Sequence, residues 1–433
     1  MSATKDLIRE IQSGAYDTAI RNLYADNDAT VSAQRERYVN AVKEFEALFG
    51  EGRDVVLYSA PGRTEIGGNH TDHNNGVVMA AAVNLDVIAV VSRNDENIAR
   101  VKSAGFDNMD VVNVTELAPR DSEKGRSAAL VRGVAAAIVR EGGAVGGFDA
   151  FTTSNVLRGS GLSSSAAFEV IIGAIFNGEY NEGRFSAVDI AKMSQYAENV
   201  FFDKPCGLMD QTACSVGSAI TIDFKDPSNP VVNKVGFDLA KHGFALCITD
   251  TKGSHADLTD DYASIRSEME GVAAYFGKKV LREVDEAELF ANIVDVREKL
   301  GDRAVLRAIH FFAECRRAQE IYRAISEDRF EDFLKHIING GHSSFEYNQN
   351  AYSIKKPREQ GVALGVALSQ HVLEGRGAWR LQGGGFAGTI QAFVPYDLLD
   401  TYRNTMDTVF GAGSCYVLSV RNYGAIPVAA ANK

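Results

Sequence analysis

The chain has 433 residues, of which 45% are hydrophobic and 24% charged, and this composition is that of an ordinary globular protein. The formal net charge of −12 argues against a large cationic surface for nucleic acid or anionic lipid, but it leaves room for a local basic site. The length predicts two to three domains.

The cysteines and the N-terminus favour a soluble cytoplasmic protein. Five cysteines are scattered, without the CxxC spacing of a zinc site or the pattern of a disulfide framework. The first ten residues lack the apolar core of a secretion signal, and no apolar run approaches the roughly 20 residues of a membrane span. We therefore expect small-molecule partners, with no nucleic acid and no membrane.

The N-terminal residues show helical spacing of apolar side chains in two places: Leu7, Ile8 and Ile11, then Val42, Phe45 and Phe49. The rest of this region is polar, so we interpret residues 1–40 as a surface helical extension. A short strand over residues 55–58 follows, and residues 59–62 are predicted to end it because they include Pro61 and Gly62.

Residues 61–76 form the richest polar stretch of the chain. They place five side chains of acid, base or cation chemistry between two apolar segments: Arg63, Glu65, His70, Asp72 and His73. A charged loop held between core strands favours a ligand site, and a solvated hairpin is the structural alternative. A metal site made of His70, Asp72 and His73 is a weaker alternative, because no helix spaces these residues and no fourth ligand is evident.

A glycine- and serine-rich loop, Gly159-Ser-Gly-Leu-Ser-Ser-Ser-Ala-Ala167, is predicted to follow two strands (residues 84–92 and 148–153) and a helix (residues 128–141). The apolar run after the loop is long enough for a buried helix that begins at the serines. A helix N-terminus attracts anions, and the hydroxyls can bind phosphate or Mg²⁺. The alternative is an ordinary serine-capped loop.

Two carboxylates follow in the middle of the chain. Ser186 and Asp189 form a predicted capping box at the start of a helix, and Glu198 falls near the C-terminal end of that helix, where the dipole disfavours an anion. Glu198 therefore calls for a cation partner unless it faces solvent. Asp210 sits among apolar neighbours after a turn at Pro205 and Gly207, and a turn-capping role is its alternative.

The second half begins after a proline-rich turn at residues 226–230, where we place a domain boundary. Strands are predicted at residues 219–224 and 243–250, and residues 284–339 are mostly helical. Residues 379–394 predict a strand, a triple-glycine turn and a second strand, and we expect the turn to approach the phosphate loop.

Four of these stretches, in this order and with this spacing, resemble signatures of the GHMP small-molecule kinases, and among them the galactokinases. Galactokinases carry Gly-Arg-x-Asn-Leu-Ile-Gly-Glu-His-x-Asp-Tyr where this chain has residues 62–73, and Gly-x-Gly-Leu-Ser-Ser-Ser-Ala-Ala at residues 159–167. They carry Ala-Glu, then an Asp twelve residues after that Glu in Pro-Cys-Gly-Ile-Met-Asp-Gln, at residues 197–211. Their Gly-Gly-Gly-Phe-Gly-Gly turn matches residues 383–388, with Ala387 replacing one glycine.

The resemblance covers about residues 45 to 425 and implies the α/β and α+β, two-domain GHMP kinase fold, with the active site in the interdomain cleft. The domains expected are the extension (residues 1–40), an N-terminal α/β domain (41–230) and a C-terminal α+β domain (231–433). ATP and Mg²⁺ are the implied cofactors, and a monosaccharide is the implied substrate.

The resemblance also implies a role for each matching residue. Asp210 is the expected catalytic base, and Arg63 supports phosphoryl transfer and keeps Asp210 ionised. Mg²⁺ is expected on Ser165 and Glu198. The ATP phosphates are expected on the loop residues Gly159, Ser160, Gly161, Leu162, Ser163, Ser164 and Ser165. The sugar is expected on Asn69, His70, Thr71, Asp72 and Tyr262, although Tyr262 has core packing as its alternative.

Three positions depart from the galactokinase pattern: Asn69 replaces Glu, Glu65 replaces Asn and His73 replaces Tyr. The Glu of galactokinases accepts a hydrogen bond from the hydroxyl on C6 of the sugar, whereas Asn removes a charge and adds a donor. This leaves a galactose 1-kinase, a 1-kinase for galacturonate, L-arabinose or N-acetylgalactosamine, and a non-catalytic sugar and ATP sensor. The sensor is disfavoured by the presence of three charged residues: Arg63, Glu198 and Asp210.

Overall fold

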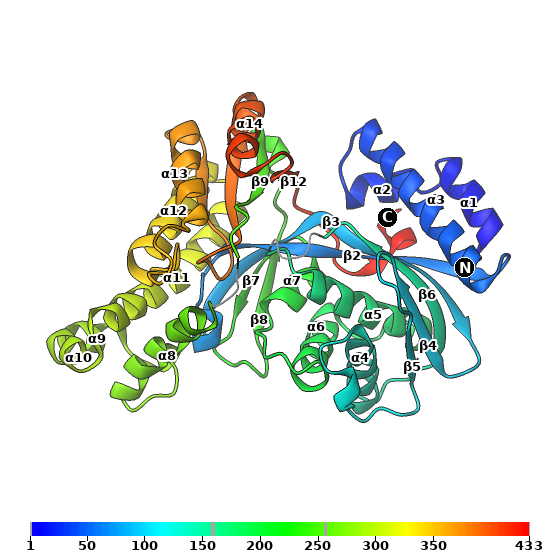
Figure 1. The fold of residues 1–433 in the computed structure, drawn as a ribbon, viewed down its shortest axis with the longest axis horizontal. Coiled ribbons are helices and arrows are strands. Elements are labelled where there is room, and N and C mark those ends of the chain that lie inside the picture. The colour runs from blue at the N-terminus through cyan, green and yellow to red at the C-terminus, as the bar shows by residue number, and fades with distance from the viewer. Residues whose placement is uncertain (1, 157–160, 255–257, 433) are drawn as a thin grey trace.

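Two β-sheets organise the chain (Figure 1). The computed structural model describes residues 2–156, 161–254 and 258–432. Two of the predicted phosphate-loop residues, Gly159 and Ser160, lie outside the described residues. Within the described part of the chain, no helix is both long and apolar enough to cross a membrane.

The first sheet has the order β1-β2-β3-β6-β4-β5, with β13 paired to β2, β7 to β3 and β8 to β7. Its described pairs are antiparallel except for β4 with β6. The long strand β3 merges two segments that the sequence suggested separately, residues 77–83 and 84–92. The strands are Ser2–Ala3 (β1), Asp54–Gly67 (β2), Val77–Asn94 (β3), Ile98–Ser103 (β4), Asp110–Asn113 (β5), Gly147–Ser154 (β6), Ala219–Asp223 (β7), Val231–Val235 (β8) and Ile426–Pro427 (β13).

Helices cover both faces of this sheet (Figure 1). The first three lie on one face and the next four on the other: Thr4–Gln12 (α1), Asp17–Leu23 (α2), Asp28–Phe49 (α3), Ser127–Arg140 (α4), Ser164–Tyr180 (α5), Ala187–Tyr196 (α6) and Met209–Val216 (α7). The helix and strand positions predicted between residues 128 and 224 are confirmed to within a few residues, including the Ser186–Asp189 capping box.

The second sheet is antiparallel, with the order β10-β11-β9-β12. Its strands are Phe244–Asp250 (β9), Ala378–Leu381 (β10), Thr389–Pro395 (β11) and Cys415–Leu418 (β12). The predicted helical region at residues 284–339 and the strand–turn–strand at 379–394 are confirmed. The helices of this half are Thr259–Tyr275 (α8), Glu286–Ala291 (α9), Ile293–Leu300 (α10), Asp302–Ser326 (α11), Phe330–Ser343 (α12), Gly361–Leu373 (α13) and Leu399–Phe410 (α14).

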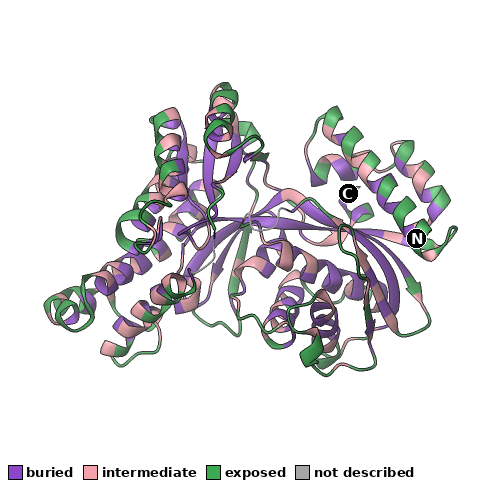
Figure 2. Ribbon diagram, in the orientation of Figure 1, coloured by how far each residue is buried: buried purple, intermediate pink, exposed green. Residues whose placement is uncertain are grey.

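The N-terminal helices are not a surface extension, because they close the core on the second face of the first sheet. Successive side chains of a strand point to opposite faces. Along β3, Val87 and Val91 pack against the face of α4–α7, whereas Ile88 and Val90 pack against α1–α3. Both faces are therefore apolar and both need a cover. Leu7, Ile11, Val42 and Phe45 are buried in this second core (Figure 2).

Elements of the structure cross the predicted domain boundaries at residues 40 and 230. Helix α3 runs through residue 40, and β8 pairs with β7 although it follows the boundary placed at residue 230. The end of the chain returns to the first sheet, where β13 pairs with β2 and Val428 packs in the core beneath α1–α3.

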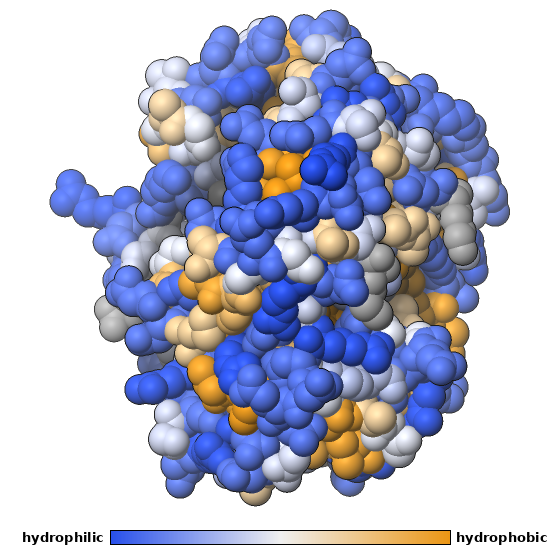
Figure 3. Space-filling view, turned by 90° about the vertical axis from the view of Figure 1, so that its right-hand side faces the viewer, coloured by the Kyte–Doolittle hydropathy of each residue, from blue (hydrophilic) through white to orange (hydrophobic). Residues whose placement is uncertain are grey.

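With their apolar sides turned to this core, the N-terminal helices leave a largely hydrophilic outer face with only small, separate hydrophobic patches (Figure 3).

A buried charge network ties these parts together, and Asp86 is its centre. Asp86 is fully buried, accepts hydrogen bonds from Arg37 Nη1 at 2.6 Å and Tyr24 Oη at 2.6 Å, and pairs with Arg421 Nη1 at 3.2 Å. Ser59 Oγ also donates to it. Burial alone would raise the pKa of Asp86, but Arg37 and Arg421 outweigh burial and hold the pKa below its usual value.

Asp86→Asn is therefore expected to lower the free energy of unfolding by about 3–5 kcal/mol in urea at pH 7, because two guanidinium groups lose a buried charged partner. The contribution of Asp86 is present above the pKa of an unfolded Asp, about 3.9, and is lost as pH falls through the lower folded pKa. The difference between the two proteins should consequently shrink in acid.

The control is Asp328→Asn. Asp328 pairs with Lys241 at 2.7 Å, but 59% of its side chain is exposed, so this change should cost far less stability than Asp86→Asn. An Asp86→Asn protein as stable as the Asp328→Asn control at pH 7 would show that the network does not hold the N-terminal helices in place.

Candidate active site between the two sheets

A cavity of about 520 Å³ lies where the two halves of the chain meet. The first half contributes the end of β2, the turn that follows it and the segment before α7, and the second half contributes α8 and the triple-glycine turn. The polar side chains on its wall are Arg63, Glu65, Asn69, His70, Asp72, His73, Asn75, Gln195 and Arg266. The sequence-predicted polar stretch and the Pro205–Gly207 turn are thus brought to one place.

Strand β2 does not end at residues 59–62, and this corrects the position of two candidate residues. The strand continues to Gly67, with register shifts against β3 between Pro61 and Arg63 and between Glu65 and Gly67. Pro61 lacks an N–H donor and is tolerated at such an irregularity. Arg63 and Glu65 are therefore buried strand residues and not part of a charged loop.

Arg63 and Asp210 form a two-pronged ion pair at the edge of the cavity. Arg63 Nε donates to Asp210 Oδ1 at 2.7 Å, and Arg63 Nη2 donates to Oδ2 at 2.6 Å. Burial alone would raise the pKa of Asp210, but the Arg63 guanidinium outweighs burial, so the pKa of this carboxyl lies below its usual value. The Asp210 side chain keeps 32% of its surface exposed, which leaves it open to a ligand.

The same pair touches the serine loop at the start of α5. Ser163 Oγ donates to Asp210 Oδ2, and Arg63 Nη1 donates to the Gly161 carbonyl. The backbone of β2 also runs against the loop, because Arg63 N donates to Leu162 O at 3.1 Å. A Cβ atom at Gly62 would lie 2.8 Å from that carbonyl, so this approach requires glycine.

The loop is poised to receive an anion. Helix α5 begins at Ser164, carries no acidic residue in its first turn and follows Ser163 in the left-handed conformation, with φ of 58°. The first N–H groups of a helix have no intrahelical acceptor and favour phosphate. The second half of the chain approaches as expected, since Gln382, just before the triple-glycine turn, donates to Gly161 O at 3.2 Å.

Glu198 lies just after α6 and has the cation partner that the sequence predicted for it. Lys204 Nζ lies 2.7 Å from Glu198 Oε1, and Gln211 Nε2 donates to Oε2 at 2.8 Å. Gln211 Nε2 also donates to Glu169 Oε2 at 3.1 Å. Burial, then the nearby Glu198, raises the pKa of Glu169 well above its usual value.

These contacts fit a magnesium ion. Glu169 lies one helical turn after Ser165, so the two side chains share a face of α5. Glu169 Oε1 is buried and has no hydrogen-bond partner among the described residues. A hydroxyl and carboxylate oxygens are the hard donors that Mg²⁺ prefers, and a bound ion would compete with Lys204 for the Glu198 carboxylate.

Three of the predicted sugar-binding residues line the cavity, and two of them, His70 and Asp72, are held in place by close contacts. His70 has φ of 58°, and its Nε2 lies 2.9 Å from Gly384 O. Burial lowers the pKa of His70 and raises the pKa of Asp72. A Cβ atom at Gly207 would lie 2.5 Å from Asp72 Oδ2, so the Cys206-Gly-Leu-Met-Asp-Gln segment fits closely against this carboxylate.

The remaining predicted sugar contacts have partners within the protein. Thr71 is fully buried, and its hydroxyl contacts Gly68 O at 2.9 Å and Val77 O at 2.8 Å. Tyr262 packs on the triple-glycine turn and donates to Gly385 O at 2.9 Å, which is the core-packing alternative. Asn69 is 1% exposed. Its Nδ2 donates to Gly383 O at 2.7 Å, and its Oδ1 accepts from Asn350 Nδ2 at 3.0 Å. The sequence pattern identified the polar stretch at residues 61–76, but not which of its side chains already have hydrogen-bond partners within the protein.

The metal site considered for His70, Asp72 and His73 is not formed. Within residues 2–156, 161–254 and 258–432, no three His, Cys, Asp or Glu side chains gather as a metal-binding group. Burial, helped by His70, lowers the pKa of His73 to about 3, so His73 is neutral. Its Nδ1 lies 2.9 Å from Asn74 Nδ2.

Sequence reasoning missed Arg380, which reaches the site from the second sheet. Arg380 is fully buried, and its Nη2 pairs with Glu65 Oε1 at 2.9 Å. Its strand, Ala378–Leu381, is otherwise apolar and completely buried. A lone arginine in such a strand is a signal, because an arginine is almost never fully buried without an anionic partner.

The site geometry fits a small-molecule kinase, and the comparisons place the chain in the GHMP class. The sequence matches the GHMP kinases N terminal domain over residues 129–218 and the galactokinase galactose-binding signature over residues 43–93. The chain is 33% identical to a galactokinase of Streptomyces coelicolor over 397 residues, which are 90% of this chain and 97% of that protein. The chain belongs to the galactokinase family.

A second relative agrees with this placement, and two solved structures share the fold. A galactokinase of Actinobacillus pleuropneumoniae serotype 3 is 30% identical, covering 84% of this chain and 91% of that protein. The fold resembles a Lactococcus lactis galactokinase complexed with galactose, with a TM-score of 0.76, 20% identity and coverage of 89% and 98% of the two chains. It also resembles Methanococcus jannaschii mevalonate kinase, with a TM-score of 0.56, 13% identity and coverage of 85% and 98%.

Proposed function

We propose that this protein transfers the γ-phosphoryl group of ATP to the anomeric hydroxyl of galactose, which gives galactose 1-phosphate and ADP. The observation that carries this proposal is the contact of Asp210 with both Arg63 and Ser163 at the edge of the cavity. One carboxylate there borders both a phosphate-binding helix start and a pocket of polar groups. Phosphoryl transfer needs this proximity more than it needs covalent chemistry.

Each group has a defined task in this proposal. The backbone N–H groups of Gly161–Ser165 and the start of α5 bind the ATP phosphates. Asp210 accepts the proton of the anomeric hydroxyl as the oxygen attacks the γ-phosphorus and the bond to the ADP oxygen breaks. Arg63 keeps Asp210 ionised and stabilises charge on the transferring group. Ser165 and Glu198 would hold Mg²⁺, which when bound offsets the charge of the phosphates.

The sugar-facing part of the proposal rests on His70 and Asp72, which reach the cavity from the turn after β2. All five cysteines are free, in keeping with a cytoplasmic setting in which ATP is abundant. The galactokinase family relationship favours galactose over other sugars. A 1-kinase for galacturonate, L-arabinose or N-acetylgalactosamine is the second candidate because Asn69 departs from the family pattern.

An activity screen tests the proposal. The purified protein, ATP and Mg²⁺ are mixed with galactose, galacturonate, L-arabinose or N-acetylgalactosamine, and ADP release is followed while ³¹P NMR identifies the phosphorylated carbon. We expect galactose to give the highest kcat/KM and the phosphate to lie on C1. A higher kcat/KM for another sugar would replace galactose as substrate. Binding of a sugar without ADP release would favour a non-catalytic sensor.

A further inference from the structure

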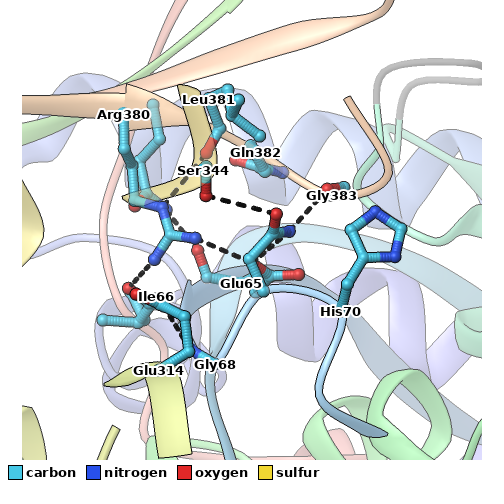
Figure 4. Close-up of polar contacts among 12 residues, drawn as sticks. Glu65, Ile66, Gly68, His70, Glu314, Ser344, Arg380, Leu381, Gln382 and Gly383 are labelled. Atoms are coloured by element: carbon cyan, nitrogen blue, oxygen red, sulfur yellow. Dashed lines mark hydrogen bonds and ion pairs between the residues drawn. The ribbon is translucent and has the colours of Figure 1, made fainter. Parts of the chain in front are cut away.

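Glu65 is held at the cavity wall by an arginine from the other half of the chain. Arg380 Nη2 pairs with Glu65 Oε1 at 2.9 Å, Arg380 Nε donates to Leu381 O at 3.1 Å and Arg380 Nη1 donates to Ile66 O. Figure 4 shows Arg380 on one side of Glu65 and His70 on the other. The guanidinium is always charged and has its donors fixed in one plane, so it fixes the orientation of the Glu65 carboxylate.

The amide of Asn69 has no bonding capacity left for a ligand. A side-chain amide has two N–H donors and an oxygen with two lone pairs. Asn69 Nδ2 donates to Glu65 Oε1 at 2.9 Å and to Gly383 O at 2.7 Å. Asn69 Oδ1 accepts from Ser344 Oγ at 3.3 Å and from Asn350 Nδ2 at 3.0 Å. Asn69 therefore stabilises the wall of the cavity and has no amide atom left to bind a ligand.

The second oxygen of Glu65 is the acceptor that remains. Both partners of the Glu65 carboxylate, Asn69 and Arg380, use Oε1, and within the described residues no hydrogen bond reaches Oε2. Glu65 lines the same cavity as His70 and Asp72. A carboxylate oxygen there can only accept, so it selects for a ligand group that donates.

The charge around Glu65 also selects against an acidic ligand. The two guanidinium groups on the cavity wall are already paired, Arg63 with Asp210 and Arg266 with Glu270. Asp72 has no ion-pair partner within 4 Å among the described residues, and it faces the same cavity. A ligand carboxylate near Glu65 and Asp72 would therefore have to draw a guanidinium away from its present partner to balance its charge.

We propose that Glu65, and not Asn69, is the specificity-determining side chain on this wall, that Glu65 Oε2 accepts a hydrogen bond from one hydroxyl of the sugar, and that it directs the enzyme to neutral sugars and against sugar acids. This inference rests on the proposed sugar kinase function. The direct sugar contact then comes from residue 65, four positions before residue 69, which the galactokinase pattern indicates.

The test compares wild type with Glu65→Gln on galactose and on a set of monodeoxygalactoses, each lacking one hydroxyl. Removal of a hydroxyl bound by a charged acceptor costs about 10- to 100-fold in kcat/KM. We expect one deoxy sugar to show this loss with wild type and to lose less than about threefold with Glu65→Gln, because the charged acceptor is already gone. Gln keeps an oxygen for Arg380 and Asn69, so the hydrogen bonds of the wall are preserved, although the stability of the protein should fall because buried Arg380 loses its charged partner.

Ser344→Ala is the matched control. Ser344 bonds to Asn69 behind the wall and does not line the cavity, so this variant disturbs the same network without touching Glu65 Oε2. It should discriminate among the deoxy sugars as wild type does. If Ser344→Ala erased the discrimination as fully as Glu65→Gln, the effect would belong to the network and the inference would be overturned.

Galacturonate gives a second readout, and its first part uses only the wild-type protein. Wild type should use it with a kcat/KM at least about 100-fold below that of galactose, and the gap should narrow at least about tenfold in Glu65→Gln. Equal use of the two sugars by wild type, or identical deoxy-sugar profiles for wild type and Glu65→Gln, would refute the role of Glu65. Wild type that phosphorylates no sugar would instead refute the proposed function, and calorimetric binding of the same deoxy series would then read the Glu65 contact directly.

Discussion

Asp210→Asn is expected to lower kcat with galactose by about 10³- to 10⁴-fold at neutral pH, because an amide cannot take the proton of the attacking hydroxyl. The carboxylate lies beside Arg63 of the cavity wall, with 32% of its side chain exposed, and it also touches Ser163. Asn has nearly the same shape and can still accept from both. ATP and galactose binding, measured by calorimetry, should therefore stay within a few fold of wild type.

The control for Asp210→Asn is the thermal transition and far-UV circular dichroism of the same protein. Arg63 loses a charged partner in the variant, so a modest fall in Tm is expected, but Arg63 keeps its hydrogen bond to the Gly161 carbonyl. Turnover within tenfold of wild type would remove Asp210 from the role of base. If turnover and the folded signal were lost together, the pH profile of a conservative Asp210→Glu variant would decide whether Asp210 is the base.

The local motifs were predictable because each combines residues that few structures need at once. The serine loop, the polar stretch around Arg63 and the Asp210 segment were each recognisable, and the structure brings all three into hydrogen-bonding contact. The helix and strand positions between residues 128 and 224 also followed from apolar periodicity and capping residues. Patterns of this kind act over a few residues, so a single sequence carries them.

What the sequence left open depends on partners far along the chain. The apolar stripes of α1 and α3 indicated that one side of each helix is buried, but not that it covers the second face of the first sheet. Pro61 and Gly62 predicted the end of a strand, whereas a register shift lets β2 continue to Gly67. A proline tolerated at an irregularity and a proline that ends a strand have the same local signature.

The sugar side of the cavity illustrates the same limit at single residues. Asn69, Thr71 and Tyr262 stand in the right segments, but their polar groups are taken by neighbours that the sequence cannot place. Arg380 is 315 positions away from Glu65, and only the pairing of the second sheet brings it there. The sequence thus located the wall of the cavity, and the hydrogen bonds of the structure show which of its polar atoms already have a partner.

Arg63→Ala is the second change with a large expected effect, and it predicts a shift in pH dependence as well as a loss of rate. The variant removes two hydrogen bonds and the cation that offsets burial at Asp210, so the pKa of Asp210 should rise. The base works only when ionised, so activity is lost as pH falls through that pKa. We expect kcat/KM at pH 7 to fall by about 10³-fold, and its acid limb to move to higher pH than in wild type.

The measurement is a profile of kcat/KM for galactose from about pH 5 to 9, with Arg63→Lys as the matched control. Lysine keeps the charge but lacks the planar fork that contacts both Asp210 oxygens and the Gly161 carbonyl. Arg63→Lys should therefore leave the acid limb near its wild-type position while kcat stays reduced, because a point charge restores ionisation but not orientation. If Arg63→Ala lost rate with no displacement of the acid limb, Arg63 would act on the phosphoryl group alone, and the ion pair would have no part in keeping the base ionised.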